Sequence, residues 1–234
     1  MRVALYLIPV TLGNSPVEQS IPLYNRRIIL GIKFFIVENV RSARRFLKQI
    51  DRSIDIDSLT FFTLNKRTQL SELDKMLLPL EVGNSVGLLS EAGCPAVADP
   101  GSEVVSIAQR KGFVVVPLVG PSSIILSIMA AGFNGQNFAF NGYLPIGQEE
   151  RKKRLKKLEQ LIYKENQTQI FIETPYRNAK MVDDIIHSCK PTTKLCIAAN
   201  LTLDNEFVKT KSILEWKNQI PDLTGWICIF LLYK

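Results

Sequence analysis

The segment from residue 88 to residue 101 has the residue types and spacing best suited to bind a ligand. An apolar strand runs into a loop that reads Ser-Glu-Ala-Gly-Cys-Pro-Ala-Val-Ala-Asp-Pro-Gly, and a helix follows it. Gly93 and Gly101 permit backbone conformations and close approaches that a side chain prevents, and the prolines restrict the shape of the loop. Open α/β sheets usually bind their ligands beyond the carboxyl ends of their strands. An ordinary strand–helix connection is the alternative, but such connections usually take about 2–6 residues.

A second candidate segment, residues 117–123, leads directly into another helix and reads Pro-Leu-Val-Gly-Pro-Ser-Ser. Hydroxyls and free backbone N–H groups at a helix start suit a carboxylate or a phosphate. Plain N-capping by Ser122 or Ser123 is the alternative. The sequence has neither a P-loop nor a GxGxxG fingerprint after its first strand.

Other kinds of reactive centre are disfavoured by the residue counts. The four cysteines have no CxxC spacing, and His187 is the single histidine. We therefore expect no disulfide scaffold, zinc site or histidine-based triad. We expect free thiols and a reducing cytoplasm. Cys94 has no evident neighbouring base to activate its thiol, so it is interpreted as a small loop residue.

Strand-like and helix-like segments alternate along the chain. We predict strands at residues 3–8, 28–37, 86–89, 113–118, 138–143, 169–173, 195–199 and 225–233, and helices at 40–50, 71–80, 102–111, 122–131, 149–164, 176–188 and 212–219. This alternation predicts an α/β fold with mixed, largely parallel sheets. The stiff segment at residues 119–121 predicts an N-terminal lobe at 1–118 and a C-terminal lobe at 119–234, with a ligand cleft between them.

The composition fits a folded protein with an acidic partner. The chain has 234 residues, 46% of them apolar, and a formal net charge of +7. Its longest apolar run, residues 226–233, is far shorter than the ~20 residues of a membrane-spanning helix. The first residues lack a cleavage site and are interpreted as a strand, not as a secretion signal.

Basic residues gather in two predicted helices, at 40–50 and 149–164. On the first, Arg41, Arg44, Arg45 and Lys48 lie opposite the apolar positions. Such faces are often merely solvated, but two of them in one basic chain favour a polyanion, because Lys and Arg contacts to phosphate supply most non-specific nucleic-acid affinity.

Six short motifs, in order along nearly the whole chain, resemble the tetrapyrrole methylase superfamily. They are Pro9…Gly13-Asn14, Glu38…Arg41, Ser90-Glu91-Ala92-Gly93-Cys94-Pro95…Asp99-Pro100-Gly101, Val116-Pro117-Leu118…Gly120-Pro121-Ser122, Phe140-Asn141-Gly142-Tyr143-Leu144-Pro145 and Glu173-Thr174-Pro175-Tyr176-Arg177. Within the superfamily, the sequence is most similar to the bacterial small-subunit ribosomal RNA cytidine 2′-O-methyltransferases. The resemblance implies a homodimeric methyltransferase of two α/β lobes that uses S-adenosylmethionine and needs no metal.

The resemblance also implies roles for particular residues. The cofactor would be bound by Ser90, Ala92, Gly93, Cys94, Pro95, Ala96, Val97, Ala98, Asp99, Ser122, Ser123, Ile172, Glu173, Asn200 and Leu201. From the residues themselves, Glu38 is assigned to the chemistry with Arg41 as its ion-pair or phosphate partner, because a ribose hydroxyl needs a proton acceptor, and Glu173 at the end of another strand is the second candidate acceptor. Arg44, Arg45 and Lys48 are expected to hold RNA, and Arg177 is expected to hold one of its phosphates. A salt-bridged strand end is the alternative for Glu38 and Glu173, and capping of its own loop is the alternative for Arg177.

Several positions depart from the branch's usual motifs. Glu91 and Cys94 replace an Asp and a Thr, Asn39 replaces an Asp, and Tyr176 replaces a His. Residues 199–203 also lack the Arg-Glu-Leu-Thr-Lys of the branch. Despite these departures, we still expect the protein to bind the cofactor. Two alternatives stay open: a methyltransferase that acts on a tetrapyrrole or other small metabolite, and a non-catalytic module that binds S-adenosylmethionine.

Overall fold

The structure, a computed structural model, describes residues 2–65 and 68–234. These residues form two five-stranded sheets with helices packed against them. The chain divides into unit 1 (Met1–Ser122) and unit 2 (Ser123–Lys234). This division falls a few residues beyond residue 118, where the sequence places the boundary. The connecting segment is held within unit 1, since Asn25 Nδ2 donates a hydrogen bond of 2.8 Å to the Val119 carbonyl.

The sheet of unit 1 is parallel throughout its described pairings. Its order is β3-β2-β4-β1-β5, with β1 at Leu5–Ile8, β2 at Phe34–Val37, β3 at Thr60–Thr63, β4 at Val86–Leu89 and β5 at Val115–Pro117. Every residue of the central strand β4 is buried. Helices cover both faces of a parallel sheet, which explains why this strand reads as a continuous apolar run.

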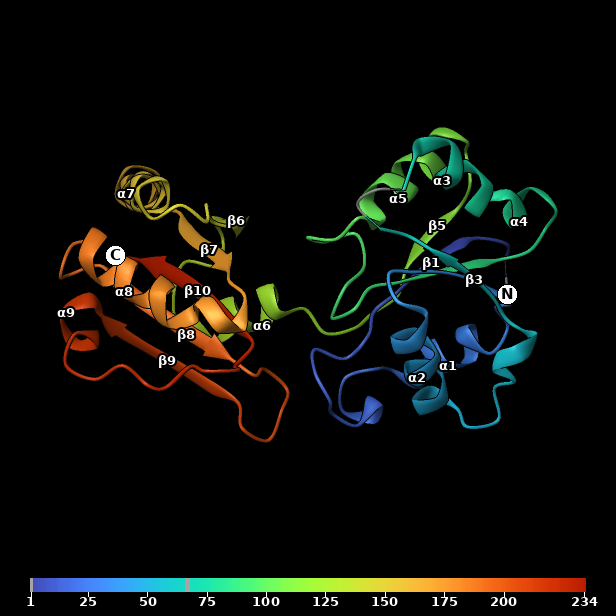
Figure 1. The fold of residues 1–234 in the computed structure, drawn as a ribbon, viewed down its shortest axis with the longest axis horizontal. Helices are drawn as coiled ribbons and strands as arrows, with labels where there is room; N and C mark the ends of the chain where they lie inside the picture. Colours follow the sequence, from blue (N-terminus) through green and yellow to red (C-terminus); the bar gives the residue numbers. More distant parts are fainter. Residues whose placement is uncertain (1, 66–67) are drawn as a thin grey trace. The chain divides into compact units, whose positions relative to one another are not determined.

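Two helical layers enclose that sheet (Figure 1). One apolar cluster joins the sheet to α1 (Leu23–Ile29) and α2 (Val40–Ile50), and a second joins its other face to α3 (Leu70–Met76), α4 (Leu78–Glu81) and α5 (Gly101–Arg110). Short 3-10 turns lie at Val17–Gln19 and Ile56–Ser58. Asn39 begins α2, because its Oδ1 accepts hydrogen bonds from the N–H groups of Arg41 and Ser42. The predicted helix at 40–50 and its apolar face are confirmed.

Unit 2 contains a mixed sheet. Its order is β6-β7-β10-β8-β9, with β6 at Phe138–Tyr143, β7 at Thr168–Ile172, β8 at Lys194–Ala199, β9 at Phe207–Ser212 and β10 at Cys228–Tyr233. β6 and β7 run parallel, and the other three described pairings are antiparallel. Its main apolar core lies between the sheet and α7 (Gln148–Glu165) with α8 (Asn178–Ser188). The remaining helical elements are α6 (Ser123–Ala131), α9 (Ile213–Trp216) and a 3-10 turn at Pro175–Arg177.

Parallel pairings outnumber antiparallel ones by five to three among the described residues, so the predicted mixed, largely parallel α/β fold is confirmed. The predicted strand at 28–37 is wrong in its first half, because Ile28 and Ile29 are the buried face of α1. A short buried apolar run fits either a strand or a helix. β3 and β9 are not in the sequence-based prediction. Both are edge strands with partly exposed residues, and Lys209 and Lys211 interrupt the apolar pattern of β9.

In the part of the chain that the structure describes, no helix combines the length and the apolar character needed to cross a membrane.

Candidate functional site

The carboxyl ends of the parallel strands lie along one edge of the unit 1 sheet. β2 and β4 are neighbours, and Val37 of one is in register with Leu89 of the other. Glu38 and Ser90, which follow these two strands, therefore lie beside each other at this edge. The structure thus brings Glu38, the candidate proton acceptor, next to the predicted cofactor loop at residues 90–101.

Gly93 is the tightest point of that loop. Its carbonyl accepts hydrogen bonds of 3.0 Å from the Val10 N–H and from Ser90 Oγ. Its φ is +68°, and a Cβ atom there would lie 3.0 Å from Leu12 Cδ2 and 3.3 Å from the Pro121 carbonyl oxygen. Both the positive φ and the close approach require glycine, as the sequence predicts for this position.

Asp99 fixes the second half of the loop. Its Oδ1 accepts hydrogen bonds of 2.8 Å from the N–H groups of Ala96 and Gly101. Burial raises the pKa of Asp99, against the opposing effect of these two donors. Ala96 and Ala98 have φ values of +66° and +62°, a conformation that costs about 1–2 kcal/mol for each alanine. Strained residues of this kind persist where surrounding contacts hold them, and they gather at ligand-binding sites.

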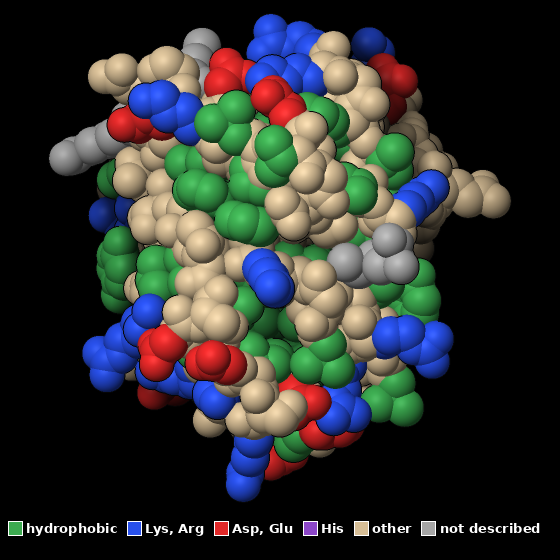
Figure 2. All heavy atoms as spheres, turned by 90° about the vertical axis from the view of Figure 1, so that its right-hand side faces the viewer, with side chains coloured by type: hydrophobic (Ala, Val, Ile, Leu, Met, Phe, Trp, Pro, Cys, Tyr) green, Lys and Arg blue, Asp and Glu red, His purple; other side chains and the backbone are tan. Residues whose placement is uncertain are grey.

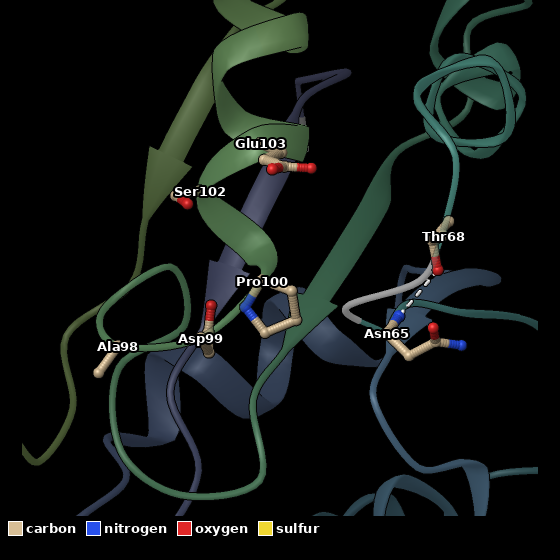
Figure 3. A pocket seen from close by; sticks show the side chains of 7 residues that line it. All are labelled: Asn65, Thr68, Ala98, Asp99, Pro100, Ser102 and Glu103. Atoms are coloured by element: carbon tan, nitrogen blue, oxygen red, sulfur yellow. Dashed lines mark hydrogen bonds between the residues drawn. The ribbon is translucent and has the colours of Figure 1, made fainter. Parts of the chain in front are cut away.

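A cavity of about 300 Å³ lies within unit 1 beside the start of α5 (Figure 3). Its lining consists of Asn65, Thr68, Ala98, Asp99, Pro100, Ser102 and Glu103. This volume is at the lower end of the range for small-molecule sites. The sequence-based site contains only Ala98 and Asp99 of this lining. Asn65 and Thr68 follow β3, a strand that the sequence-based prediction lacks, so no signal placed them here.

Helix α2 begins at the same edge of the sheet and touches the loop. Glu91, which replaces the usual Asp, accepts a hydrogen bond of 3.0 Å from Ser42 Oγ on the first turn of α2. The predicted basic residues of this helix, Arg41, Arg44, Arg45 and Lys48, are exposed. Arg44 lies over the Phe61 ring at 5.6 Å from its centroid. The basic face predicted for α2 is therefore accessible to a polyanion.

Among the described residues at this edge, we find neither a reactive thiol nor a metal centre. Burial raises the pKa of Cys94, and its Sγ lies 3.4 Å from the Pro121 carbonyl oxygen, so the thiol is protonated and part of the loop packing. No cluster of three or more His, Cys, Asp or Glu side chains that could hold a metal ion occurs among the described residues.

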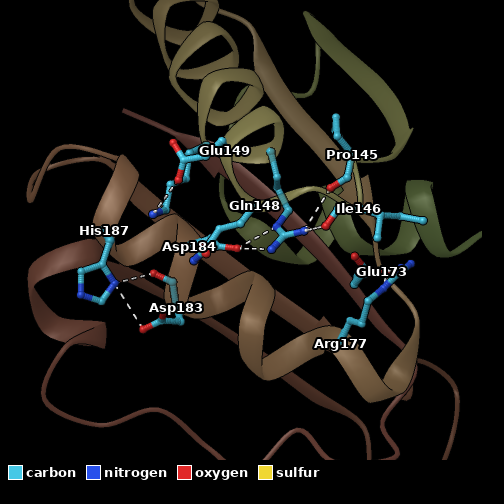
Figure 4. A network of polar contacts seen from close by, with 11 residues as sticks. Pro145, Ile146, Gln148, Glu149, Glu173, Arg177, Asp183, Asp184 and His187 are labelled. Carbon is cyan, nitrogen blue, oxygen red and sulfur yellow. Dashed lines mark hydrogen bonds and ion pairs between the residues drawn. The ribbon is translucent and has the colours of Figure 1, made fainter.

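Glu173 and Arg177 of unit 2 form an ion pair (Figure 4). Glu173 Oε1 accepts hydrogen bonds from Arg177 Nη2 at 2.7 Å, from Arg177 Nε at 2.9 Å and from the Thr174 N–H at 2.7 Å. The Glu173 side chain is only 1% exposed. For Glu173 the geometry favours a salt-bridged strand end over a free carboxylate. For Arg177 it favours a cap on its own loop over a free side chain that could bind a phosphate.

The other residues of unit 2 implied in cofactor binding lie at the ends of elements. Ile172 ends β7, Ser123 begins α6, and Leu201 is buried. Asn200 follows β8 with a φ of +51°, and its Oδ1 accepts a hydrogen bond of 3.0 Å from the Ile227 N–H. This bond fixes the turn after β8. The role of these residues, and of the half-buried Ser122 in unit 1, in binding a cofactor stays a prediction.

Arg151, which the sequence places in the second basic segment, is buried in unit 2 and does not belong to an accessible basic face. Its side chain is 2% exposed and forms an ion pair with the fully buried side chain of Asp184 on α8. Its Nη1 donates a hydrogen bond of 2.7 Å to the Ile146 carbonyl (Figure 4). Lys153, Lys156 and Lys157 of the same segment are exposed. The face of the molecule in Figure 2 mixes basic, acidic and apolar side chains, so positive charge alone does not mark a binding surface there.

The fold is that of the tetrapyrrole methylases. The methyltransferase CobJ superposes with a TM-score of 0.66 at 15% sequence identity, covering 99% of this chain and 94% of that one. A uroporphyrin-III C-methyl transferase from Thermus thermophilus, complexed with S-adenyl homocysteine, gives a TM-score of 0.57 at 14% identity, covering 99% and 97%. At such identities the likeness concerns the fold alone.

Sequence relatives identify the family. No protein-family model matches the chain. A ribosomal RNA small subunit methyltransferase I from Vibrio cholerae is 29% identical over 90% of this chain and 69% of its own length. The relative of the same name from Thermotoga maritima is 33% identical over 69% of this chain and 73% of its own. The chain therefore belongs to the ribosomal RNA small subunit methyltransferase I family.

Proposed function

We propose that the protein is an S-adenosylmethionine-dependent methyltransferase that acts on a ribose 2′-hydroxyl of small-subunit ribosomal RNA. Membership of the ribosomal RNA small subunit methyltransferase I family carries this proposal. The relatives' name supplies the substrate class, and the similarity of the motifs to the 2′-O-methylating branch supplies the acceptor atom.

The residues of the unit 1 loop fit the proposed cofactor. A Cβ at Gly93 would meet Leu12 and Pro121, so the missing side chain keeps the backbone of the loop close to its neighbours, and Val97 and Ala98, further along the loop, are exposed residues that a ligand can reach. When bound, S-adenosylmethionine supplies the reactive methyl group, so the protein's task is to position the acceptor and to take up its proton.

Glu38 is the residue that we assign to proton uptake. It follows β2 at the edge where the cofactor loop begins, and it is half-buried. Arg41, the second residue of α2, is assigned to a phosphate of the same RNA segment. A base within hydrogen-bond reach of the ribose hydroxyl raises the nucleophilicity of its oxygen.

The test of the proposed activity is methyl transfer from labelled S-adenosylmethionine to under-modified small ribosomal subunits. Digestion and mapping should place the label on the ribose of one nucleotide. Transfer to a porphyrinoid and not to the subunits would contradict the RNA substrate. Absence of transfer to any acceptor, with the cofactor bound, would leave only a binding module.

The basic face of α2 yields a prediction about salt dependence. Replacing both Arg45 and Lys48 by glutamine should weaken RNA binding and reduce the steepness of log affinity against log salt concentration by about 1.4–1.8, because each phosphate contact contributes about 0.7 on a single strand and about 0.9 on a duplex. A salt series of RNA-binding measurements checks this. Lys75→Gln with Arg110→Gln removes equal charge from the ends of α3 and α5 and should leave the slope unchanged. Equal slopes for both double variants would show that α2 does not contact phosphate.

We also propose a cytoplasmic homodimer. The free cysteines fit a reducing compartment. Ile125 and Met129 expose apolar side chains on α6, which suits an interface between copies. Sedimentation equilibrium of the purified chain checks the dimer, and a concentration-independent monomer mass would contradict it.

A further inference from the structure

Tyr176 is an exposed aromatic residue in the 3-10 turn that follows β7, and the proposed function gives it no role. The residue is 81% exposed, the largest value among the exposed large hydrophobic residues of the described chain. It replaces the histidine that the branch usually has in this motif. Exposed apolar side chains are common on protein surfaces, so exposure alone carries no inference.

The surroundings of Tyr176 distinguish it from an ordinary surface tyrosine. Arg177 Cζ lies 5.5 Å from the centroid of the Tyr176 ring, within the range of a cation–π contact. The guanidinium is itself held through two of its nitrogens by the buried Glu173 carboxylate. Pro175 also restricts the backbone of the 3-10 turn that carries the ring. The ring is therefore presented to solvent on a rigid support.

The charges around the ring indicate which part of a nucleic acid fits it. Glu173 neutralises Arg177, so the pair offers little net attraction to a phosphate. An aromatic ring instead binds the face of a base, and unpaired RNA bases commonly stack on aromatic side chains and on arginine planes. Tyrosine also suits this use because few rotatable bonds have to be ordered when it binds.

We propose that Tyr176 is a stacking platform for an unpaired base of the RNA substrate, with Arg177 and Glu173 as positioning residues that fix the ring. This inference rests on the proposed function, because it takes the substrate to be RNA. It assigns to the 173–177 turn recognition of a base face in place of the phosphate contact that the sequence predicts for Arg177.

The experiment measures labelled methyl transfer to under-modified small ribosomal subunits at a range of subunit concentrations. Tyr176→Ala should raise the KM for subunits by about 5- to 150-fold, the equivalent of one stacked base, and leave the KM for S-adenosylmethionine unchanged. Tyr176→Phe keeps the ring and should retain the wild-type KM. Tyr24→Ala, which removes another exposed tyrosine from α1, is the matched control and should also behave as wild type.

A salt series separates stacking from charge. The loss in Tyr176→Ala should be the same factor at every salt concentration, because stacking releases no counterions. A wild-type KM in Tyr176→Ala, a loss in Tyr176→Phe equal to that in Tyr176→Ala, or a changed salt slope would each overturn the inference. If the wild-type protein transfers no methyl group to subunits, the proposed function itself fails. Transfer by the wild type with unchanged KM in Tyr176→Ala overturns the stacking role alone.

Discussion

Replacing Asp184 by asparagine should lower the free energy of unfolding of unit 2 by about 3–5 kcal/mol. Asp184 is fully buried and accepts hydrogen bonds from Arg151 Nε at 2.7 Å and from Gln148 Nε2 at 2.9 Å. The substitution preserves the shape of the side chain but leaves the buried Arg151 guanidinium without a counter-charge. Removing one partner of a buried pair costs far more than removing one partner of an exposed pair, because the remaining charge cannot regain its hydration.

Tryptophan fluorescence during urea unfolding measures this loss directly. The chain's two tryptophans, Trp216 and Trp226, both lie in unit 2, so the signal follows that unit. Lys152→Ala breaks an exposed contact to Glu149 at 3.6 Å on the same helix and should change stability by less than about 1 kcal/mol. The double variant Arg151→Met with Asp184→Leu removes both charges and should recover most of the loss. Equal stability of Asp184→Asn and the wild type would contradict the buried-charge explanation.

The Arg151–Asp184 pair also shows what the sequence cannot reveal. The run of basic residues at 151–164 predicts a single accessible face. The partner of Arg151 lies 33 residues further along the chain, on α8. Only the packing of α7 against α8 brings the two together, so local charge patterning cannot separate this buried arginine from Lys153 or Lys156. Arg177 differs, because its partner Glu173 is only four residues away, and the sequence already offers a salt-bridged strand end and a capped loop as the alternatives for this pair.

The candidate site in unit 1 was more predictable because its signals are local. The loop context predicts a special backbone conformation or a close approach at Gly93, and the structure shows both, a positive φ and a crowded Cβ position. The strand that precedes the loop is apolar at every position. The cavity residues Asn65 and Thr68 were not predictable, because they follow an edge strand whose weak alternation gives no periodic signal. The sequence also does not predict which backbone N–H groups Asp99 binds. The left-handed conformations of Ala96 and Ala98, which shape this part of the loop, have no signature in the sequence.

Replacing Asp99 by alanine should weaken binding of S-adenosylhomocysteine, the demethylated cofactor product, by about 30- to 150-fold. The Asp99 carboxylate holds the N–H groups of Ala96 and Gly101, and hydrogen bonds to a charged group contribute about 1.5–3 kcal/mol each. Without them, the strained conformations of Ala96 and Ala98 lose their support. If about 2–3 kcal/mol of net support disappears, the binding-competent loop becomes a minor state, and the apparent affinity falls in proportion to its population.

Isothermal titration with S-adenosylhomocysteine checks this prediction, and an isosteric variant supplies the control. Asp99→Asn keeps an oxygen that can accept both backbone hydrogen bonds but lacks the charge, which roughly halves the strength of such bonds. Its affinity should therefore fall by less than about tenfold and lie between those of the wild type and Asp99→Ala. Because Asp99 lies in unit 1, tryptophan fluorescence should report an unchanged unit 2 in both variants. Wild-type affinity in Asp99→Ala would show that the shape of this loop does not determine cofactor binding.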